Sequence, residues 1–173
     1  MAGVFLSYRR TDSGGWTGRL RDHLVLRYGE DHVWQDVDDL TVGSDYFPQI
    51  LEHIATADAV LVVIGPHWLE RAKDGTTRLA ARNDVLRAEI VHALKRKSGV
   101  IPILVGGANM PEAKALPRPV APLVKRHGIA LTDADWGRSM ELLLQKLQDL
   151  SRTARVAARR RVPNRTSSAT PDL

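Results

Sequence analysis

The sequence predicts an α/β fold of the flavodoxin-like type, in which helices cover both faces of a five-stranded parallel sheet of order 2-1-3-4-5 and make three layers. Short apolar runs typical of strands alternate with segments of helical periodicity, which favours a parallel sheet. Residues 59–64 are continuously apolar, as expected of a central strand that is buried on both faces. The length of 173 residues suits one domain, residues 1–150, and a tail, residues 151–173.

The first half of the chain holds three of the expected strands and two helices. Gly29 is a signal for the end of the first helix, and Gly65 with Pro66 ends the third strand. The expected elements are a strand at residues 4–6, a loop at 8–15, a helix at 16–28, a strand at 32–35, a loop at 38–45, a helix at 47–54 and the strand at 59–64.

A loop rich in charge, residues 70–82, opens the second half of the chain. The helical pattern after it covers residues 83–94, and Gly99 is expected to stop this helix. The fourth strand is expected at residues 100–105. Because Pro102 cannot donate to a strand ladder, we expect an edge-side position or a bulge there.

The chain ends in a short strand and a long helix. The fifth strand is expected at residues 129–131, and Asp133 or Asp135 can cap the helix that follows. The apolar face of this helix ends at Leu150. No sustained apolar periodicity is present from residue 151 on, so we expect disorder or a linker there.

The composition excludes several classes of protein. The absence of cysteine rules out a disulfide framework, thiol catalysis and a cysteine-based zinc site. The six histidines show no paired spacing of the H-E-x-x-H kind, so no metal site is expected. No apolar run approaches about 18 residues, so we expect no membrane partner. The chain opens without a basic leader and cleavage site, which makes the cytoplasm the simplest location.

The net charge of +5 does not by itself indicate a nucleic-acid partner, because the basic residues are unevenly placed. Residues 152–165 hold six arginines and no acidic residue, and the rest of the chain is close to neutral without them. We therefore expect this run to be a solvated tail, and we expect no nucleic acid as a partner.

The helix at residues 83–94 carries an acidic residue at an apolar position. At about 100° per residue, Glu89 falls inside the stripe that Val85 and Ile90 belong to. Carboxylates are rarely buried without a partner. Glu89 therefore either forms an ion pair with a nearby arginine or lies where the stripe opens into a pocket.

The expected topology favours the pocket at one edge of the sheet. In the 2-1-3-4-5 order, a ligand sits at the carboxyl ends of strands one and three. Arg9 and Arg10 follow strand one, and Trp68 follows strand three. Because the helix after strand three begins at the same edge, Glu89 is brought towards these three residues.

Two other uses of this topology are less well supported. Residues 13–18 are one glycine short of the dinucleotide-binding motif G-x-G-x-x-G, and the expected loop from Tyr8 to Gly15 is too long for its tight turn. A phosphoacceptor receiver domain needs an aspartate at the end of strand three, where Gly65 and Pro66 stand. The spacing shows no Ser/His/Asp arrangement and no G-x-S-x-G motif.

Five stretches in unbroken order resemble the Toll/interleukin-1 receptor (TIR) domain family, over roughly residues 3–150. The likeness is strongest to bacterial members and to the neuronal NAD-cleaving member. Five motifs in register are far more specific than any one of them. The stretches are FLSYRR at residues 5–10, WQDVDDL at 34–40 with Gly43, LVVIGPHWL at 61–69, DVLRAEI at 84–90 and VIPIL at 100–104.

The resemblance implies an activity as well as a fold. In NAD-cleaving members a glutamate on the third helix is catalytic, and the match falls on Glu89. An aromatic residue often stands one turn earlier, where this chain has Val85, and Trp68 or Tyr46 can take over its stacking role. The loop from Asp38 to Tyr46 resembles the BB loop, which closes over the site and mediates assembly. A homo-oligomer formed through this loop is therefore expected.

The implied chemistry needs NAD+ as substrate, and no separate cofactor or metal is expected. Cleavage of the bond between nicotinamide and ribose passes through an oxocarbenium-like state, which a nearby carboxylate can stabilise. The site implied by the resemblance comprises Glu89 for catalysis and Tyr8, Arg9, Arg10, Asp36, Tyr46, Trp68 and Val85 for binding the substrate.

Two groups in this implied site have an alternative interpretation. Arg9 and Arg10 suit the pyrophosphate, because guanidinium groups pair well with phosphate oxygens. They can equally form a salt link within the fold, and the candidate acids are Asp36, Asp38 and Glu89. The tryptophans at positions 34 and 68 are candidates for stacking platforms, and core packing is the alternative favoured for both.

Three functions are compared. The first is cleavage of NAD+ to nicotinamide and ADP-ribose or a cyclic ADP-ribose, in bacterial defence or signalling and activated by self-association. The second is a scaffold without catalysis that binds other TIR-domain proteins. The third, a dinucleotide-dependent oxidoreductase, is disfavoured because the loop after strand one is a poor match to the dinucleotide-binding motif. Many adaptor members lack the catalytic glutamate, so the presence of Glu89 favours the first function.

Overall fold

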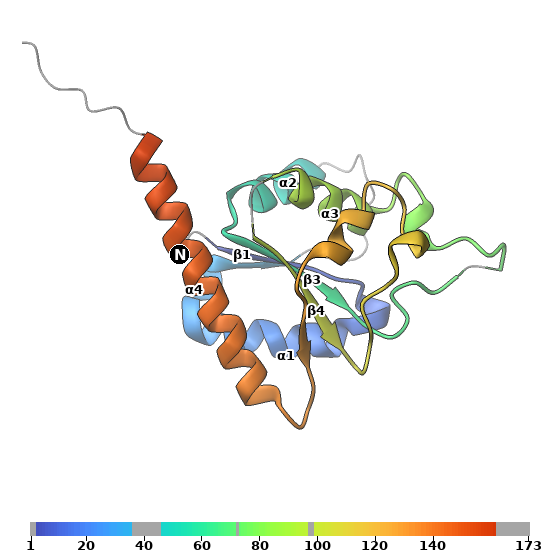
Figure 1. The fold of residues 1–173 in the computed structure, drawn as a ribbon, viewed down its shortest axis with the longest axis horizontal. Coiled ribbons are helices and arrows are strands. Elements are labelled where there is room, and N and C mark those ends of the chain that lie inside the picture. The colour runs from blue at the N-terminus through green and yellow to red at the C-terminus, as the bar shows by residue number, and fades with distance from the viewer. Residues whose placement is uncertain (1–2, 36–45, 72, 97–98, 162–173) are drawn as a thin grey trace, which may run out of the picture.

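The computed structural model describes residues 3–35, 46–71, 73–96 and 99–161, and it holds the expected parallel sheet. The strand order is β2-β1-β3-β4-β5, and all four neighbouring pairs are parallel (Figure 1). The predicted fold class is therefore confirmed. The strands are β1 (Val4–Ser7), β2 (Val33–Gln35), β3 (Ala59–Ile64), β4 (Gly99–Val105) and β5 (Ile129–Leu131).

Four α-helices within the described residues cover the two faces of this sheet. Helices α1 and α4 pack on one face, and α2 and α3 lie together on the other (Figure 1). The helices are α1 (Arg10–Tyr28), α2 (Phe47–Thr56), α3 (Val85–Lys95) and α4 (Trp136–Arg161). Each face has its own hydrophobic core, which we call the α1/α4 core and the α2/α3 core.

Strand β1 sends alternate side chains into the two cores. Leu6 and Tyr8 belong to the α1/α4 core, and Phe5 belongs to the α2/α3 core. Because side chains of a strand alternate between the faces of its sheet, Ser7 and Arg9 face the same side as Phe5. This side is the one that α3 covers.

The predicted loop from Tyr8 to Gly15 is wrong, because α1 begins at Arg10. Arg9 is extended, with φ −111° and ψ 113°, and its carbonyl accepts the first bonds of the helix. Gly14 lies inside the helix, which is kinked at Ser13 (φ −134°, ψ 15°). The glycines therefore do not form a turn, and the length of that loop no longer argues against the dinucleotide motif; the missing glycine still does.

The elements around α3 and β4 differ from the prediction at their ends only. Helix α3 ends at Lys95, and Gly99 is the first residue of β4 and not the stop of the helix. The ladder between β4 and β5 begins at the pair Ile103 and Ile129. At Pro102, β4 therefore has a strand neighbour on the β3 side alone, which is the edge-side position predicted for this residue.

Helix α4 continues past the predicted boundary at residue 150. It runs to Arg161, and Ser151 is buried with 8% of its surface exposed. The prediction of disorder or a linker from residue 151 is therefore wrong for residues 151–161. Alanine and arginine are strong helix formers, so a helix can propagate here without an apolar stripe. In the part of the chain that the structure describes, no helix is both long and apolar enough to span a membrane.

Candidate functional site

Glu89 is buried where α3 crosses the carboxyl end of β1. Its Oε2 accepts a hydrogen bond from Ser7 Oγ over 2.5 Å, and the two residues are 1% and 0% exposed. Ser7 is the last residue of β1 and is paired with Val62 of β3, so the bond fixes Glu89 at the β1/β3 edge that the topology predicts.

Arg9 forms a buried ion pair with Asp84 at the same edge. Its Nη1 and Nη2 both lie 3.1 Å from Asp84 Oδ2, and Nη2 lies 3.3 Å from Oδ1. The two side chains are 7% and 5% exposed. A salt link was one interpretation of Arg9, but its candidate partners, Asp36, Asp38 and Glu89, did not include Asp84. The pair occupies both terminal nitrogens of the guanidinium group.

Asp84 also caps α3. Its Oδ1 accepts a hydrogen bond of 2.8 Å from the backbone N–H of Arg87, which is otherwise unsatisfied at a helix start. One carboxylate therefore starts the helix that carries Glu89 and ties that helix to the end of β1 through Arg9.

A second carboxylate, that of Asp12 in α1, holds the loop after β3. Its Oδ2 accepts from the backbone N–H of Gly65 over 2.8 Å, and its Oδ1 accepts from that of His67 over 2.7 Å. A Cβ on Gly65 would lie 2.5 Å from Oδ1, so glycine leaves room for this approach. The start of α1 and the end of β3 are thereby fastened together.

We expect Asp12→Ala to lower the free energy of unfolding by about 1–3 kcal/mol, because two backbone N–H groups lose their acceptor. Urea denaturation of both forms measures the change. Asp22→Ala, at an exposed position of the same helix, is the matched control and is expected to stay within about 0.5 kcal/mol of the parent. Equal stabilities of the two variants would show that Asp12 does not hold the loop.

A cavity of about 220 Å³ lies between the start of α1 and the segment after β3. Its wall carries three arginines and a histidine against two acids, so it is net cationic. Trp68 lines it while packing in the α2/α3 core with 3% of its surface exposed, and its Nε1 has no partner among the described residues. The lining residues are Arg9, Thr11, Asp12, His67, Trp68, Glu70, Arg71 and Arg78.

The structure gathers part of the predicted site. Arg9 and Trp68 line one cavity, and Glu89 lies on the helix that Arg9 holds through its ion pair. Val85 is the half-buried first residue of that helix. The packing role favoured for Trp68 agrees with its burial.

Other predicted residues lie elsewhere. Tyr8, 7% exposed, packs in the α1/α4 core, on the face of the sheet opposite to Glu89. Arg10 is the exposed first residue of α1, and Tyr46, 62% exposed, immediately precedes α2. Asp36 and the predicted assembly loop up to residue 45 lie outside the described residues. The roles of these side chains in substrate binding and assembly stay predictions.

Two residues that contact the predicted site, Ser7 beside Glu89 and Asp84 beside Arg9, were not among the residues predicted from the sequence. A signal for Ser7 exists, because a strand that directs Leu6 to one core must direct Ser7 to the other, where Glu89 lies. A signal for Asp84 exists as well, since aspartate one position before a helix is a preferred cap. No group of three metal-ligating side chains occurs within the described part of the chain, and the absence of a metal stays a prediction.

The chain matches a known protein family in sequence as well as in fold. The profile of the family described as "TIR domain" matches residues 4–144, which is most of the chain. The chain belongs to the TIR domain family. The family identified from the five sequence motifs is thereby confirmed.

Two curated relatives of this TIR domain carry the name of an enzyme. The protein "NAD(+) hydrolase SARM1" of Danio rerio is 26% identical over 145 residues, which cover 84% of this chain and 19% of that protein. The protein "NAD(+) hydrolase sarm1" of Drosophila melanogaster is 29% identical over 126 residues, which cover 73% of this chain and 9% of that protein. The TIR domain described here therefore spans about a fifth or less of the length of these relatives.

Solved TIR structures show the same fold. The TIR domains of the activated Roq1 resistosome match with a TM-score of 0.58 and 16% identity, over 87% of this chain and 99% of that one. The TIR domain of the Toll-related receptor TRR-2 from Hydra magnipapillata matches with a TM-score of 0.55 and 16% identity, over 86% of this chain and 99% of that one. At these identities the likeness concerns the fold alone.

Proposed function

We propose that this TIR domain cleaves NAD+ at the bond between nicotinamide and ribose, with Glu89 as the catalytic residue. The observation that carries the proposal is a buried carboxylate, held by the Ser7 hydroxyl at the β1/β3 edge of the sheet. This is the edge at which ligands bind in such folds. The names of the two relatives, both NAD+ hydrolases at under 30% identity, support the same reaction.

The reaction balances without a cofactor besides the substrate. The bond between the nicotinamide nitrogen and ribose C1′ breaks, and nicotinamide leaves as a neutral molecule with the bonding electron pair. Water then adds to C1′ and releases one proton, which gives ADP-ribose; attack by an adenine nitrogen in place of water gives a cyclic ADP-ribose. Because nicotinamide is cationic while bound to ribose, no general acid is needed to protonate it.

The proposed role of Glu89 is electrostatic. Positive charge develops on the ribose as nicotinamide leaves, and a fixed carboxylate in a water-poor site stabilises that charge. Ser7 would hold the carboxylate in place. For the substrate pyrophosphate, Arg10, Arg71 and Arg78 are the proposed partners, because Arg9 is already engaged with Asp84.

We further propose that self-association completes the site. The cavity of about 220 Å³ beside Arg9 is smaller than the roughly 300–1,000 Å³ of pockets that hold small molecules. A neighbouring protomer can supply the missing walls, with the Asp38–Tyr46 loop as the proposed contact. The proposed setting is a cytoplasmic defence or signalling response, and other TIR-domain proteins are candidate partners.

The nicotinamide released per protein molecule is expected to rise with protein concentration. The physical reason is mass action, since only associated protomers would hold a complete site. Chromatography of NAD+ incubations, from dilute to concentrated protein at fixed NAD+, measures the effect and identifies the second product as linear or cyclic. A rate per molecule that is independent of protein concentration would contradict the role of association.

A non-catalytic scaffold is the second candidate function, and it is favoured by the small exposed surface of Glu89, which leaves little of the carboxylate for a substrate to contact. Glu89 is 1% exposed, and its carboxylate accepts a hydrogen bond from Ser7. A carboxylate with a purely structural role would show the same burial and the same bond. A scaffold would bind other TIR domains and release no nicotinamide at any concentration. The incubations described above therefore separate the two functions.

A further inference from the structure

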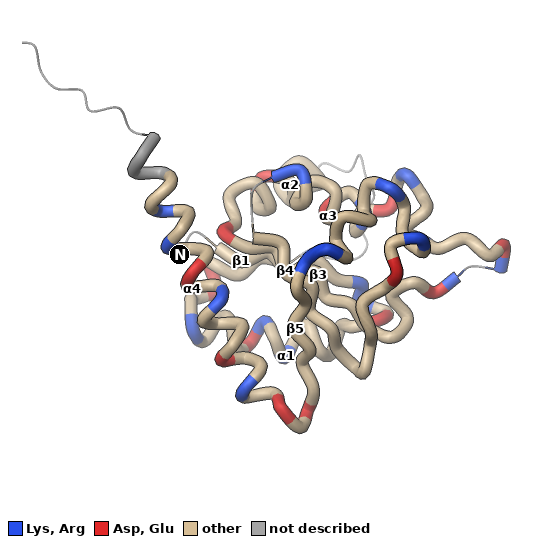
Figure 2. The backbone as a smooth tube through the Cα atoms, viewed as in Figure 1, with Lys and Arg blue, Asp and Glu red and all other residues tan. Residues whose placement is uncertain are grey.

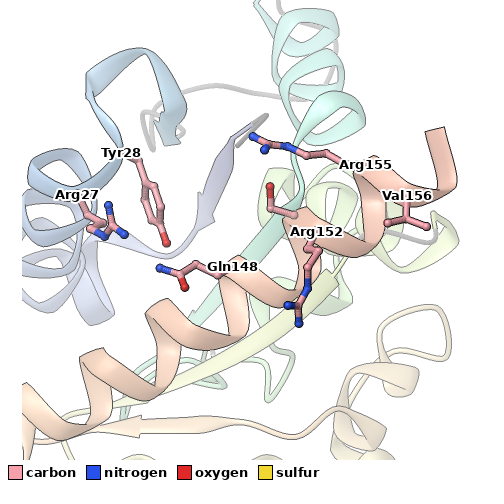
Figure 3. A pocket seen from close by; sticks show the side chains of 7 residues that line it. Arg27, Tyr28, Gln148, Arg152, Arg155 and Val156 are labelled. Atoms are coloured by element: carbon pink, nitrogen blue, oxygen red, sulfur yellow. The ribbon is translucent and has the colours of Figure 1, made fainter. Parts of the chain in front are cut away.

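A second cavity, of about 560 Å³, lies between the end of α1 and the later turns of α4 (Figure 3). Its volume falls within the roughly 300–1,000 Å³ of small-molecule pockets. Helix α1, with 19 residues from Arg10 to Tyr28, separates it from the candidate site, and at a rise of about 1.5 Å per residue its two ends lie roughly 27 Å apart. It is therefore a separate place on the molecule, and the inference below does not rest on the proposed function.

The walls of this cavity are cationic. Arg27 comes from α1 and Arg155 from α4, and neither forms an ion pair with any residue that the structure describes. Arg155 reaches from α4 across towards the α1 side, whereas Arg152 points away (Figure 3) and pairs with Asp149 over 2.8 Å. No acidic side chain is among the described lining residues. Figure 2 shows basic and no acidic residues on the last described turns of α4.

A hydroxyl donor completes the polar lining. The Tyr28 hydroxyl is buried and has no hydrogen-bond partner among the described residues. It points across the cavity towards Gln148 (Figure 3). Burial raises the pKa of Tyr28 above its ordinary value of 10.0, and the nearby charge of Arg27 opposes this to a smaller extent. The group therefore stays protonated at neutral pH and can donate to an acceptor in the cavity.

We propose that this cavity binds a small phosphate monoester that carries an apolar or aromatic group. The phosphate would lie between Arg27 and Arg155, whose guanidinium groups match phosphate oxygens, and would accept a hydrogen bond from Tyr28. The organic group would pack on the ring of Tyr28, which lines the cavity from the α1 side. An acceptor-only anion satisfies the buried hydroxyl and both cations at once, which a neutral ligand cannot do.

Isothermal titration of the full chain with phenyl phosphate tests the site. We expect saturable binding that Arg155→Gln weakens about tenfold or more, because a charge-assisted bond is lost. Tyr28→Phe, which keeps the ring and removes the hydroxyl, is expected to weaken it as well. Arg138→Gln, at an exposed position in the first turn of the same helix, removes an equal charge and is expected to change nothing.

Further arms of the experiment can overturn the proposal. The absence of binding, or equal binding by the Arg155→Gln and Arg138→Gln variants, would do so. If inorganic phosphate binds as tightly as phenyl phosphate, the Tyr28 ring contributes nothing to binding, and the proposed apolar contact is refuted. Phosphatidylcholine vesicles with and without phosphatidic acid separate a membrane phosphate from a soluble one. If the protein sediments with vesicles that contain phosphatidic acid, if this depends on Arg155 and if phenyl phosphate does not bind, the ligand is a membrane phosphate. That result would refute the proposal of a soluble ligand.

Discussion

Glu89→Gln is expected to reduce NAD+ cleavage by about 10²–10³-fold while the domain stays folded. Glutamine has nearly the size of glutamate, and its amide oxygen can still accept the hydrogen bond from Ser7. The substitution therefore removes the negative charge and keeps the packing. Nicotinamide release, followed by chromatography at high protein concentration, measures the loss of activity.

The control for this experiment is Glu141→Gln, an exposed position on α4, which is expected to keep full activity. Thermal unfolding of each variant shows whether the fold is retained. Full activity of the Glu89→Gln variant would make Glu89 a structural residue and would refute the proposed site. No release by the parent chain at high concentration would favour the scaffold.

The second prediction with a large expected effect concerns the buried ion pair of Arg9 and the stability of the fold, not the activity. Arg9→Ala is expected to lower the free energy of unfolding by about 3–5 kcal/mol, because it leaves the Asp84 carboxylate buried without its counter-charge. For a domain of this size the midpoint of thermal unfolding should fall by roughly 6–20 °C. Urea denaturation and thermal scans give the two quantities.

Arg152→Ala is the matched control for the ion pair. It removes an arginine from a surface pair with Asp149, whose side chains are 79% and 59% exposed, and such pairs contribute about 0–1 kcal/mol. An Arg9→Ala variant as stable as the Arg152→Ala variant would contradict the importance of the buried pair. The double variant Arg9→Ala/Asp84→Ala should lose less than the sum of the single losses, since each single change already breaks the contact.

The strands could be predicted closely from the sequence because each is a short apolar run with a clear end. Residues 59–64 and 129–131 are strands with the predicted bounds. Their patterns depend on burial in one sheet, which the alternating order of elements already indicates. The topology then placed Glu89 at the correct edge.

The ends of the helices were predicted less well, for two physical reasons. Gly14 and Gly15 suggest a turn, but in α1 the backbone bonds of the helix outweigh the local preference of glycine. At the other end of the chain, α4 continues after Leu150 with residues that favour a helix intrinsically and need no buried face. Periodicity detects burial, so it does not detect a helix that projects into solvent.

The meeting of Glu89 and Arg9 at one edge of the sheet was easier to predict than the individual contacts there. The burial of Glu89 follows from the helical period, and its place at the β1/β3 edge follows from the strand order. The choice of Asp84 as partner of Arg9 depends on how α3 is placed on β1, and residues 75 positions apart in the chain give no local signal of their pairing. Long-range partners of this kind are decided by packing, which periodicity does not describe.

Side chains alternate between the two cores from Phe5 to Arg9, and this alternation constrains the length of residues 5–9 more than their composition. Ser7 and Arg9 reach α3 because both stand an even number of positions from Phe5, whereas Leu6 and Tyr8 stand an odd number away. Insertion or deletion of one residue inside the segment would exchange this parity and turn the arginine into the opposite core. Natural variation among close homologues should therefore include substitutions here and avoid single-residue gaps.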